Sequence, residues 1–178
     1  MPRKYPSYPY IEPMVCGKSD DEIEAIVRKL LAQNPDLSVQ DGGPMDALCR
    51  ALEVDVEYSD VPNEILLDVP LDRNAVIFLP KNSKTRHDRL ATATGLGHWL
   101  LHVPPTRKAR PDVGIQALYE PTETKAFEEA RRFAFALLMP MEAFKSLWYE
   151  GGGQLTAETL NVPTQSVYDR AKILDLAS

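Results

Sequence analysis

The sequence predicts an α+β fold that is mostly helical and contains a small three-stranded sheet. Three observations predict it. Apolar residues recur at helical spacing over residues 23–31, they alternate with acidic residues over residues 54–58, and two long apolar stretches follow in the second half of the chain. With 178 residues, 44% hydrophobic and 26% charged, the chain has the size and composition of one globular domain with at most a small appendage.

The N-terminal part predicts an extended arm followed by two helices. Proline and tyrosine dominate the first residues, so we expect an arm over residues 1–18. Ser19 and Glu22 have the spacing of a capping box, in which each side chain bonds the other residue's backbone N–H. Asn34 and the proline after it end the first helix, and a shorter helix is expected to start at Pro44.

The segment over residues 54–79 predicts the three strands of the sheet. The first is the alternating stretch from Val54 to Tyr58. Two more short apolar stretches follow at residues 65–69 and 75–79. Turn residues at Pro62-Asn63 and at 72–74 separate the three.

The central part of the chain predicts a buried helix over residues 89–102. Its apolar positions form a narrow stripe in which glycines permit close packing. We expect a proline-rich, basic loop over residues 104–121 and another helix over residues 126–138. The stripe consists of Leu90, Ala93, Gly97 and Leu101.

The C-terminal part predicts a small helical tail. Pro140 can start a new helix, and the consecutive glycines at residues 151–153 predict a flexible joint. We therefore expect a main domain over residues 19–150 and a tail over residues 151–178. The tail has the pattern of a helix-turn-helix, with Thr164 expected to cap its last helix.

Composition excludes several classes of protein. The net charge of −6 argues against a general affinity for nucleic acid. No apolar stretch approaches the roughly 20 residues that cross a bilayer, and the N-terminus has no signal-peptide pattern, so no membrane partner is expected. Cys16 and Cys49 form neither a disulfide framework nor a metal-spaced pair, which favours a reducing cytoplasm.

Local charge leaves two interpretations open. Basic clusters flank the central helix and are either solvated loop charge or a docking surface for an acidic partner. The tail has two cations against three anions, so we expect packing or dimerisation there rather than DNA reading. The flanking clusters are Lys81, Lys84, Arg86, His87 and Arg89 on one side and Arg107, Lys108 and Arg110 on the other. The tail charges are Arg170 and Lys172 against Glu158, Asp169 and Asp175.

The central helix carries an incomplete form of a zinc-protease motif. In H-E-x-x-H, two histidines four residues apart hold zinc and the glutamate acts on the bound water. Here Thr94 stands at the first histidine position and Gly95 at the glutamate position, and His98 is the second histidine. His98 and His102 also lie four apart on one helix face, but Trp99 follows the first of them, so this second register also lacks a general base.

Two stretches about 30 residues apart, over residues 89–102 and 128–140, resemble the ImmA/IrrE-type zinc metallopeptidases. The resemblance implies a zincin-like scaffold whose sheet edge receives an extended substrate. It also implies that Glu129 is the third zinc ligand, and Glu129 borders the buried side of its helix. The alternative for Glu129 is an ion pair with Arg89 or Arg131. Active members of the family are bacterial or phage proteins that relieve repression by a helix-turn-helix repressor.

A catalytic zinc needs about three protein ligands and an open position for water. Threonine is a poor zinc ligand and glycine has no side chain, so we expect no catalytic residue, no cofactor and no bound metal. His98, His102 and Glu129 are the vestigial metal ligands. The leading prediction is a pseudoprotease that regulates a protein partner, expected to be a helix-turn-helix transcriptional repressor, by binding it. One alternative is a zinc endopeptidase using the three vestigial ligands, and another is a DNA-binding regulator acting through the tail.

Overall fold

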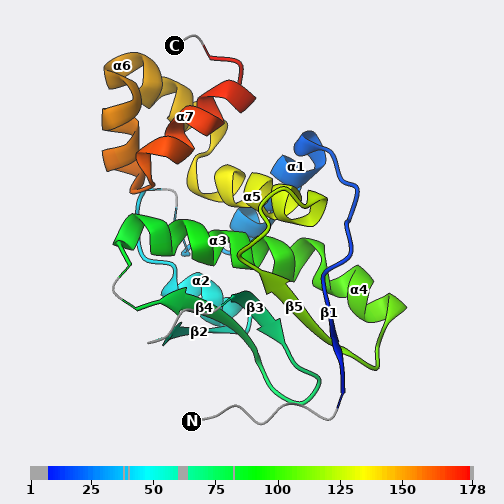
Figure 1. Cartoon of the computed structure of the whole chain (residues 1–178). Coiled ribbons are helices and arrows are strands. Elements are labelled where there is room, and N and C mark those ends of the chain that lie inside the picture. The colour runs from blue at the N-terminus through cyan, green and yellow to red at the C-terminus, as the bar shows by residue number, and fades with distance from the viewer. Residues whose placement is uncertain (1–7, 38, 40, 60–63, 82, 177–178) are drawn as a thin grey trace.

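The computed structural model describes residues 8–37, 39, 41–59, 64–81 and 83–176 (Figure 1). The predicted α+β fold with a majority of helix is confirmed. The sheet forms one layer, helix α3 packs across it, and α5 and α1 lie on the other side of α3 (Figure 1). The elements are β1 (Tyr10–Ile11), α1 (Asp20–Gln33), α2 (Asp46–Ala51), β2 (Val54–Ser59), β3 (Ile65–Val69), β4 (Ala75–Pro80), α3 (Thr85–Leu101), α4 (Val103–Ala109), β5 (Gly114–Leu118), α5 (Lys125–Leu138), α6 (Met141–Leu160) and α7 (Thr164–Ile173).

The sheet has five strands among the described residues, in the order β1-β5-β3-β4-β2, so the predicted number of three is wrong. The three predicted strands are confirmed as β2, β3 and β4. The two further strands come from segments expected to be an arm and a loop. Strand β1 pairs in parallel with β5, with Tyr10 opposite Gly114. The N-terminal arm therefore covers the sheet edge that β5 would otherwise expose.

The segment over residues 104–121 is not the predicted loop, because it contains α4 and β5. Pro104 and Pro105 occupy the first turn of α4, where a missing backbone N–H breaks no helical hydrogen bond. Ile115 and Ala117 of β5 are buried against the core. Prolines that read as loop residues in the sequence therefore start a helix here.

Helices α3 and α5 approach closely at Gly97. A β-carbon added to Gly97 would lie 2.7 Å from the backbone oxygen of Ala130 and 3.0 Å from its Cα. Only glycine lets the two backbones come so near, which confirms the predicted role of a glycine in close packing. The close approach brings His98 and His102 on α3 toward Glu129 on α5.

Helix α1 begins and ends where the sequence predicts. Ser19 and Glu22 form both hydrogen bonds of the capping box, and Asn34 is the C-cap. Helix α2 starts at Asp46, two residues after Pro44. The predicted turn at Pro62-Asn63 and the first seven residues of the predicted arm lie outside the described part of the chain.

The predicted flexible joint at the three glycines is instead a kink inside α6, at Gly152 (φ 71°, ψ −162°). Asn161 ends α6 in a left-handed conformation, and α7 follows as the second helix of the tail. Pro163 is its N-cap and Thr164 its first residue, so the predicted cap by Thr164 is wrong. Arg170 of α7 donates to the carbonyl of Met139 at 3.1 Å, which holds the tail against α5.

No helix in the described part of the chain is long and apolar enough to cross a membrane.

Candidate functional site

Thr94 and Gly95, which stand where the H-E-x-x-H motif has its first histidine and its glutamate, face different surroundings. Thr94 is buried, donates its hydroxyl to the Leu90 carbonyl at 2.8 Å, and lines a cavity of about 330 Å³. Gly95 lies against the sheet, where an added β-carbon would be 2.9 Å from both Cγ1 and Cδ1 of Ile77. Ile77 is fully buried. The space beside Gly95 is therefore filled by a hydrocarbon side chain from β4.

The remaining candidates form a chain of hydrogen bonds between α3 and α5. Nδ1 of His98 lies 2.9 Å from Nδ1 of His102, and Nε2 of His102 lies 2.8 Å from Oε1 of Glu129. The two histidines are 2% and 0% exposed, so solvent does not compete for these bonds. The sequence-predicted residues His98, His102 and Glu129 are thus brought together by the fold.

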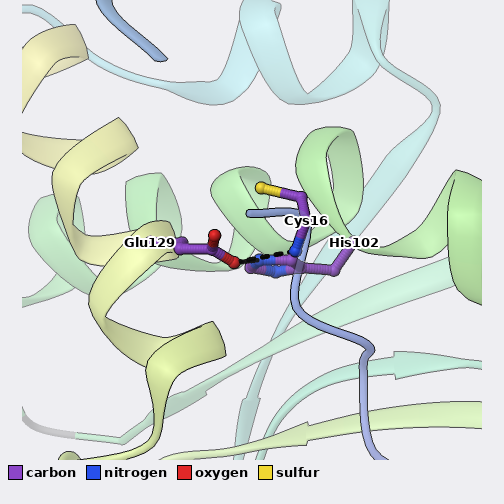
Figure 2. Close-up of side chains that lie close together, drawn as sticks. All are labelled: Cys16, His102 and Glu129. Atoms are coloured by element: carbon purple, nitrogen blue, oxygen red, sulfur yellow. Dashed lines mark hydrogen bonds and ion pairs between the residues drawn. The ribbon is translucent and has the colours of Figure 1, made fainter. Parts of the chain in front are cut away.

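Glu129 is also the anchor of the N-terminal arm. Its Oε1 accepts the backbone N–H of Cys16 at 2.9 Å, and its Oε2 accepts that of Gly17 at 2.8 Å. Figure 2 shows the Glu129 carboxylate pointing toward both His102 and Cys16 of the arm. The carboxylate therefore has three hydrogen-bond donors, and two of them come from a segment more than 100 residues away.

Burial and hydrogen bonding set the charge of the network. Burial by itself would raise the pKa of Glu129, but the donors from Cys16, His102 and Gly17 hold it below its ordinary value. Burial lowers the pKa of His102, although Glu129 opposes this shift. Burial and the neighbouring His102 lower the pKa of His98 to about 3. At neutral pH the network is one carboxylate and two neutral imidazoles.

These charge states determine which ring nitrogen carries the proton in His102 and in His98. An ionised carboxylate only accepts, so Nε2 of neutral His102 carries the proton and its Nδ1 is the acceptor. His98 must then donate from Nδ1, which leaves its Nε2 with a lone pair. That nitrogen is buried and has no hydrogen-bond partner in the described part of the chain. His98 also lines a second cavity of about 180 Å³, together with Glu12 and Val15 of the arm.

The residues at the motif positions do not fit the zinc site that the motif implies. The first histidine position is Thr94, whose hydroxyl is bonded within its own helix. Both oxygens of Glu129 accept backbone N–H groups, and the Nδ1 of His98 points at His102 rather than at a point shared with Glu129. A metal would have to replace several of these bonds. The general-base position holds Gly95, and the space beside it is filled by Ile77.

A different set of donors lies close together. One ligand atom each from Cys16, His102 and Glu129 lies within 4.8 Å of the other two, among the residues that the structure describes (Figure 2). Thiolate, imidazole and carboxylate are all zinc ligands in proteins. Sequence reasoning missed Cys16 because it lies 113 residues from Glu129 and no local pattern links the two.

The two arginines proposed as partners of Glu129 bind elsewhere, so that alternative is wrong. Arg89 is buried and donates to the carbonyls of Val39, Gly43, Leu160 and Asn161. It therefore ties the loop before α2 to the end of α6. Arg131 pairs with Asp169 of the tail at 2.6 Å.

Comparison with known proteins gives one family. Residues 49–172, about seven-tenths of the chain, match the model of a family described as the IrrE N-terminal-like domain, Peptidase_M78. The match covers α3 and α5 and includes Thr94, Gly95, His98, His102 and Glu129. The comparison with curated proteins found no match.

Proposed function

The chain belongs to the IrrE N-terminal-like family, and on this premise we propose that it is a pseudoprotease, which binds a segment of a partner protein and does not cut it. The observation that carries the proposal is the network around Glu129. The expected third zinc ligand is occupied by His102 and by two backbone N–H groups of the chain itself. A carboxylate bonded in this way is a structural anchor.

The surroundings of Gly95 support the same proposal. Hydrolysis by a zinc-bound water needs a group that takes the proton from that water. Gly95 offers no such group, and the adjoining space is filled by Ile77. Thr94 at the other position is a neutral hydroxyl engaged within the helix. Three features of metal-dependent hydrolysis are thus missing at once: a ligand, a free carboxylate and a base.

The groove beside this helix supports a binding function. The cavity at Thr94 is mostly apolar, and its wall combines residues from α3, the sheet and α5. Extended peptides bind such places through backbone hydrogen bonds and apolar side chains. Since the family resemblance implies action on a repressor, we propose a helix-turn-helix transcriptional repressor of a bacterium or phage as the partner. Lining residues of the groove are Leu66, Leu90, Ala91, Thr94, Tyr119 and Phe127.

The experiment is capture of partners by the tagged chain, followed by measurement of their intact mass with and without added zinc. We expect a bound protein that stays full length in both cases. The control is Ala91→Phe, a substitution on the half-buried face of α3 that fills the groove and should abolish capture. A partner cut only when the wild-type chain and zinc are both present would overturn the proposal.

A second candidate, zinc-dependent chemistry at a non-standard site, is favoured by the close approach of His102, Glu129 and Cys16. It differs from the sequence-based alternative, since His98 contacts His102 and is not part of the close group. Native mass spectrometry of protein purified without chelator separates the two candidates. One zinc per chain that is lost in His102→Ala favours the second.

The third candidate, DNA reading by the tail, has less support. Arg170 is 2% exposed and pairs with Glu24 of α1 at 2.7 Å. A buried arginine with an acidic partner does not contact phosphate, which leaves Lys172 as the exposed cation of α7.

A further inference from the structure

The N-terminal arm lies along the β5 edge of the sheet, beside a cavity that shares Phe127 with the groove at Thr94. Strand β1 pairs in parallel with β5 and covers its backbone on that side, and Gly114 donates its backbone N–H to the Pro9 carbonyl at 2.9 Å. In Figure 1 the arm runs from the sheet, beside α4, to the start of α1. The edge is thus occupied by the chain itself.

The arm is held at several points along its length. The hydroxyl of Tyr8 accepts the backbone N–H of Leu71 at 3.0 Å, which fixes its first described residue. The ring of Tyr10 lies directly on Gly114, because a β-carbon there would come within 2.3 Å of the ring. Further along, the backbone N–H of Met14 donates to Oγ1 of Thr106 at 2.8 Å.

The last contact of the arm is with Glu129. Gly17 adopts φ +71°, a left-handed conformation that glycine allows at little cost. In this conformation the consecutive N–H groups of Cys16 and Gly17 both point at the Glu129 carboxylate. Two neighbouring backbone N–H groups on one carboxylate form a charge-assisted anchor.

From these contacts we infer that the arm is a resident occupant of the binding edge, and that the partner segment displaces it by making the same contacts. The inference rests on the proposed function and specifies the partner chemically. The segment is extended and runs parallel to β5. It places an aromatic ring over Gly114. It ends in a small residue followed by a glycine, and the backbone N–H groups of these two residues reach Glu129.

Competition follows from geometry, since β3 pairs with one side of β5 and the arm with the other, and Glu129 has only two oxygens. Arm and partner cannot pair with β5 together. A substitution that weakens the pairing of the arm with β5 raises the fraction of molecules in which the β5 edge is uncovered. The affinity for any segment that pairs with this edge must rise by the same factor. This reciprocity gives the inference a quantitative test.

The test uses Gly17→Ala in the full chain. An alanine at positive φ is disfavoured by about tenfold, and its methyl group meets nothing within 4 Å, so the change acts on the arm's conformation alone. The matched control is Gly152→Ala, since Gly152 has the same φ of +71° and the same open space but lies in α6, outside the arm. Tyr10→Ala is a second variant, which removes the ring from Gly114 and leaves β5 intact.

Two measurements are made on each variant. Amide hydrogen exchange at Cys16 and Gly17 reports arm release, and we expect about a tenfold increase in rate for Gly17→Ala over the control. A synthetic peptide covering residues 8–18, with serine replacing the cysteine, then serves as the competing segment. It should bind Gly17→Ala and Tyr10→Ala about tenfold more tightly than the wild type, and addition of Glu129→Gln should abolish that gain.

Equal peptide affinity for the wild type and both arm variants would overturn the inference, and so would a peptide that binds none of them. These outcomes differ from failure of the proposed function. A cleaved partner refutes the pseudoprotease and leaves the peptide results unchanged, whereas an intact partner with no peptide competition refutes only the role of the arm.

Discussion

Ile77 of the sheet occupies the space beside Gly95 of the central helix. A β-carbon at position 95 would lie 2.9 Å from the Ile77 side chain, closer than two carbon atoms approach. The position where the motif has its glutamate is therefore closely packed against a hydrocarbon side chain. Replacing Gly95 alone with glutamate would force the new side chain against Ile77.

The first prediction concerns this pair. Gly95→Glu should lower the free energy of unfolding by about 2–3 kcal/mol, because the new side chain is forced against a closely packed core. Ile77→Ala alone should cost about 2–5 kcal/mol through the cavity it leaves. In the double variant the Ile77→Ala change opens room for the glutamate. The loss of stability in the double variant should therefore be smaller than the sum of the two single losses by at least about 1 kcal/mol. Urea unfolding of the four proteins measures the coupling. Costs that simply add would show that residues 77 and 95 do not share the space.

The second prediction compares two glycines on α3. Gly97→Ala pushes a methyl group into the backbone of Ala130, which cannot move without separating α3 from α5. We expect a loss of about 3 kcal/mol. Gly95→Ala meets Cγ1 and Cδ1 of the Ile77 side chain, which can shift more easily than a backbone, and it gains about 1 kcal/mol of helix propensity, so its net cost should be about 0–2 kcal/mol. Thermal unfolding ranks the two, and an equal or reversed order contradicts the close approach of the helices.

The third prediction is a loss of stability in mild acid. The pKa of His98 is about 3 in the folded chain and about 6.5 when the chain is unfolded, so the unfolded state binds more protons between these values. Stability therefore falls as the pH drops below about 6.5, by about 2 kcal/mol between pH 7 and pH 5 for His98 alone. His102 adds to this loss, because burial lowers its pKa too. Unfolding by urea at a series of pH values measures the effect.

A matched pair of variants assigns the acid effect. His98→Gln removes the buried titrating group, so the difference between pH 7 and pH 5 should shrink. His87→Asn removes an exposed histidine from the same helix and serves as the control. The measurement stops at pH 5 because Glu129, whose pKa is also lowered, adds its own loss of stability below about pH 4.5. An identical pH dependence in both variants would contradict the buried neutral state of His98.

The fourth prediction separates packing from DNA reading in the tail. Arg170→Met leaves Glu24 and the Met139 carbonyl without their donor, and we expect a loss of about 3 kcal/mol. Lys172→Met removes the same charge from an exposed position on α7 and should change stability by less than about 0.5 kcal/mol. Chemical unfolding tests both. A tail that reads DNA would instead show weaker DNA binding in both variants with unchanged stability.

Most of the fold follows from local patterns in the sequence. The capping box at Ser19, the alternation from Val54 and the helix over residues 126–138 are all confirmed. The sequence does not predict β5 because it follows a proline-rich, basic segment typical of a loop, and it does not predict β1 because that strand has only two residues. Such short strands are fixed by their pairing partner rather than by their own pattern.

The site was predictable only in part, for the same reason. The motif positions Thr94, Gly95, His98 and Glu129 can be read from spacing, and the fold brings His98 and Glu129 to either side of His102. The contact of Glu129 with the arm links residues 112 and 113 positions apart. Nothing in the local sequence around Cys16 or Ile77 signals a partner at that distance, so these contacts appear only when the chain is folded.

The most direct test of the central claim, that Glu129 anchors the chain itself and not a catalytic metal, is the mass of the native protein. The full chain is purified without chelator, supplied with one equivalent of zinc and measured by native mass spectrometry beside His102→Ala, which removes the imidazole next to Glu129. We expect the metal-free mass for both proteins. One zinc per wild-type chain that disappears in His102→Ala would contradict the claim.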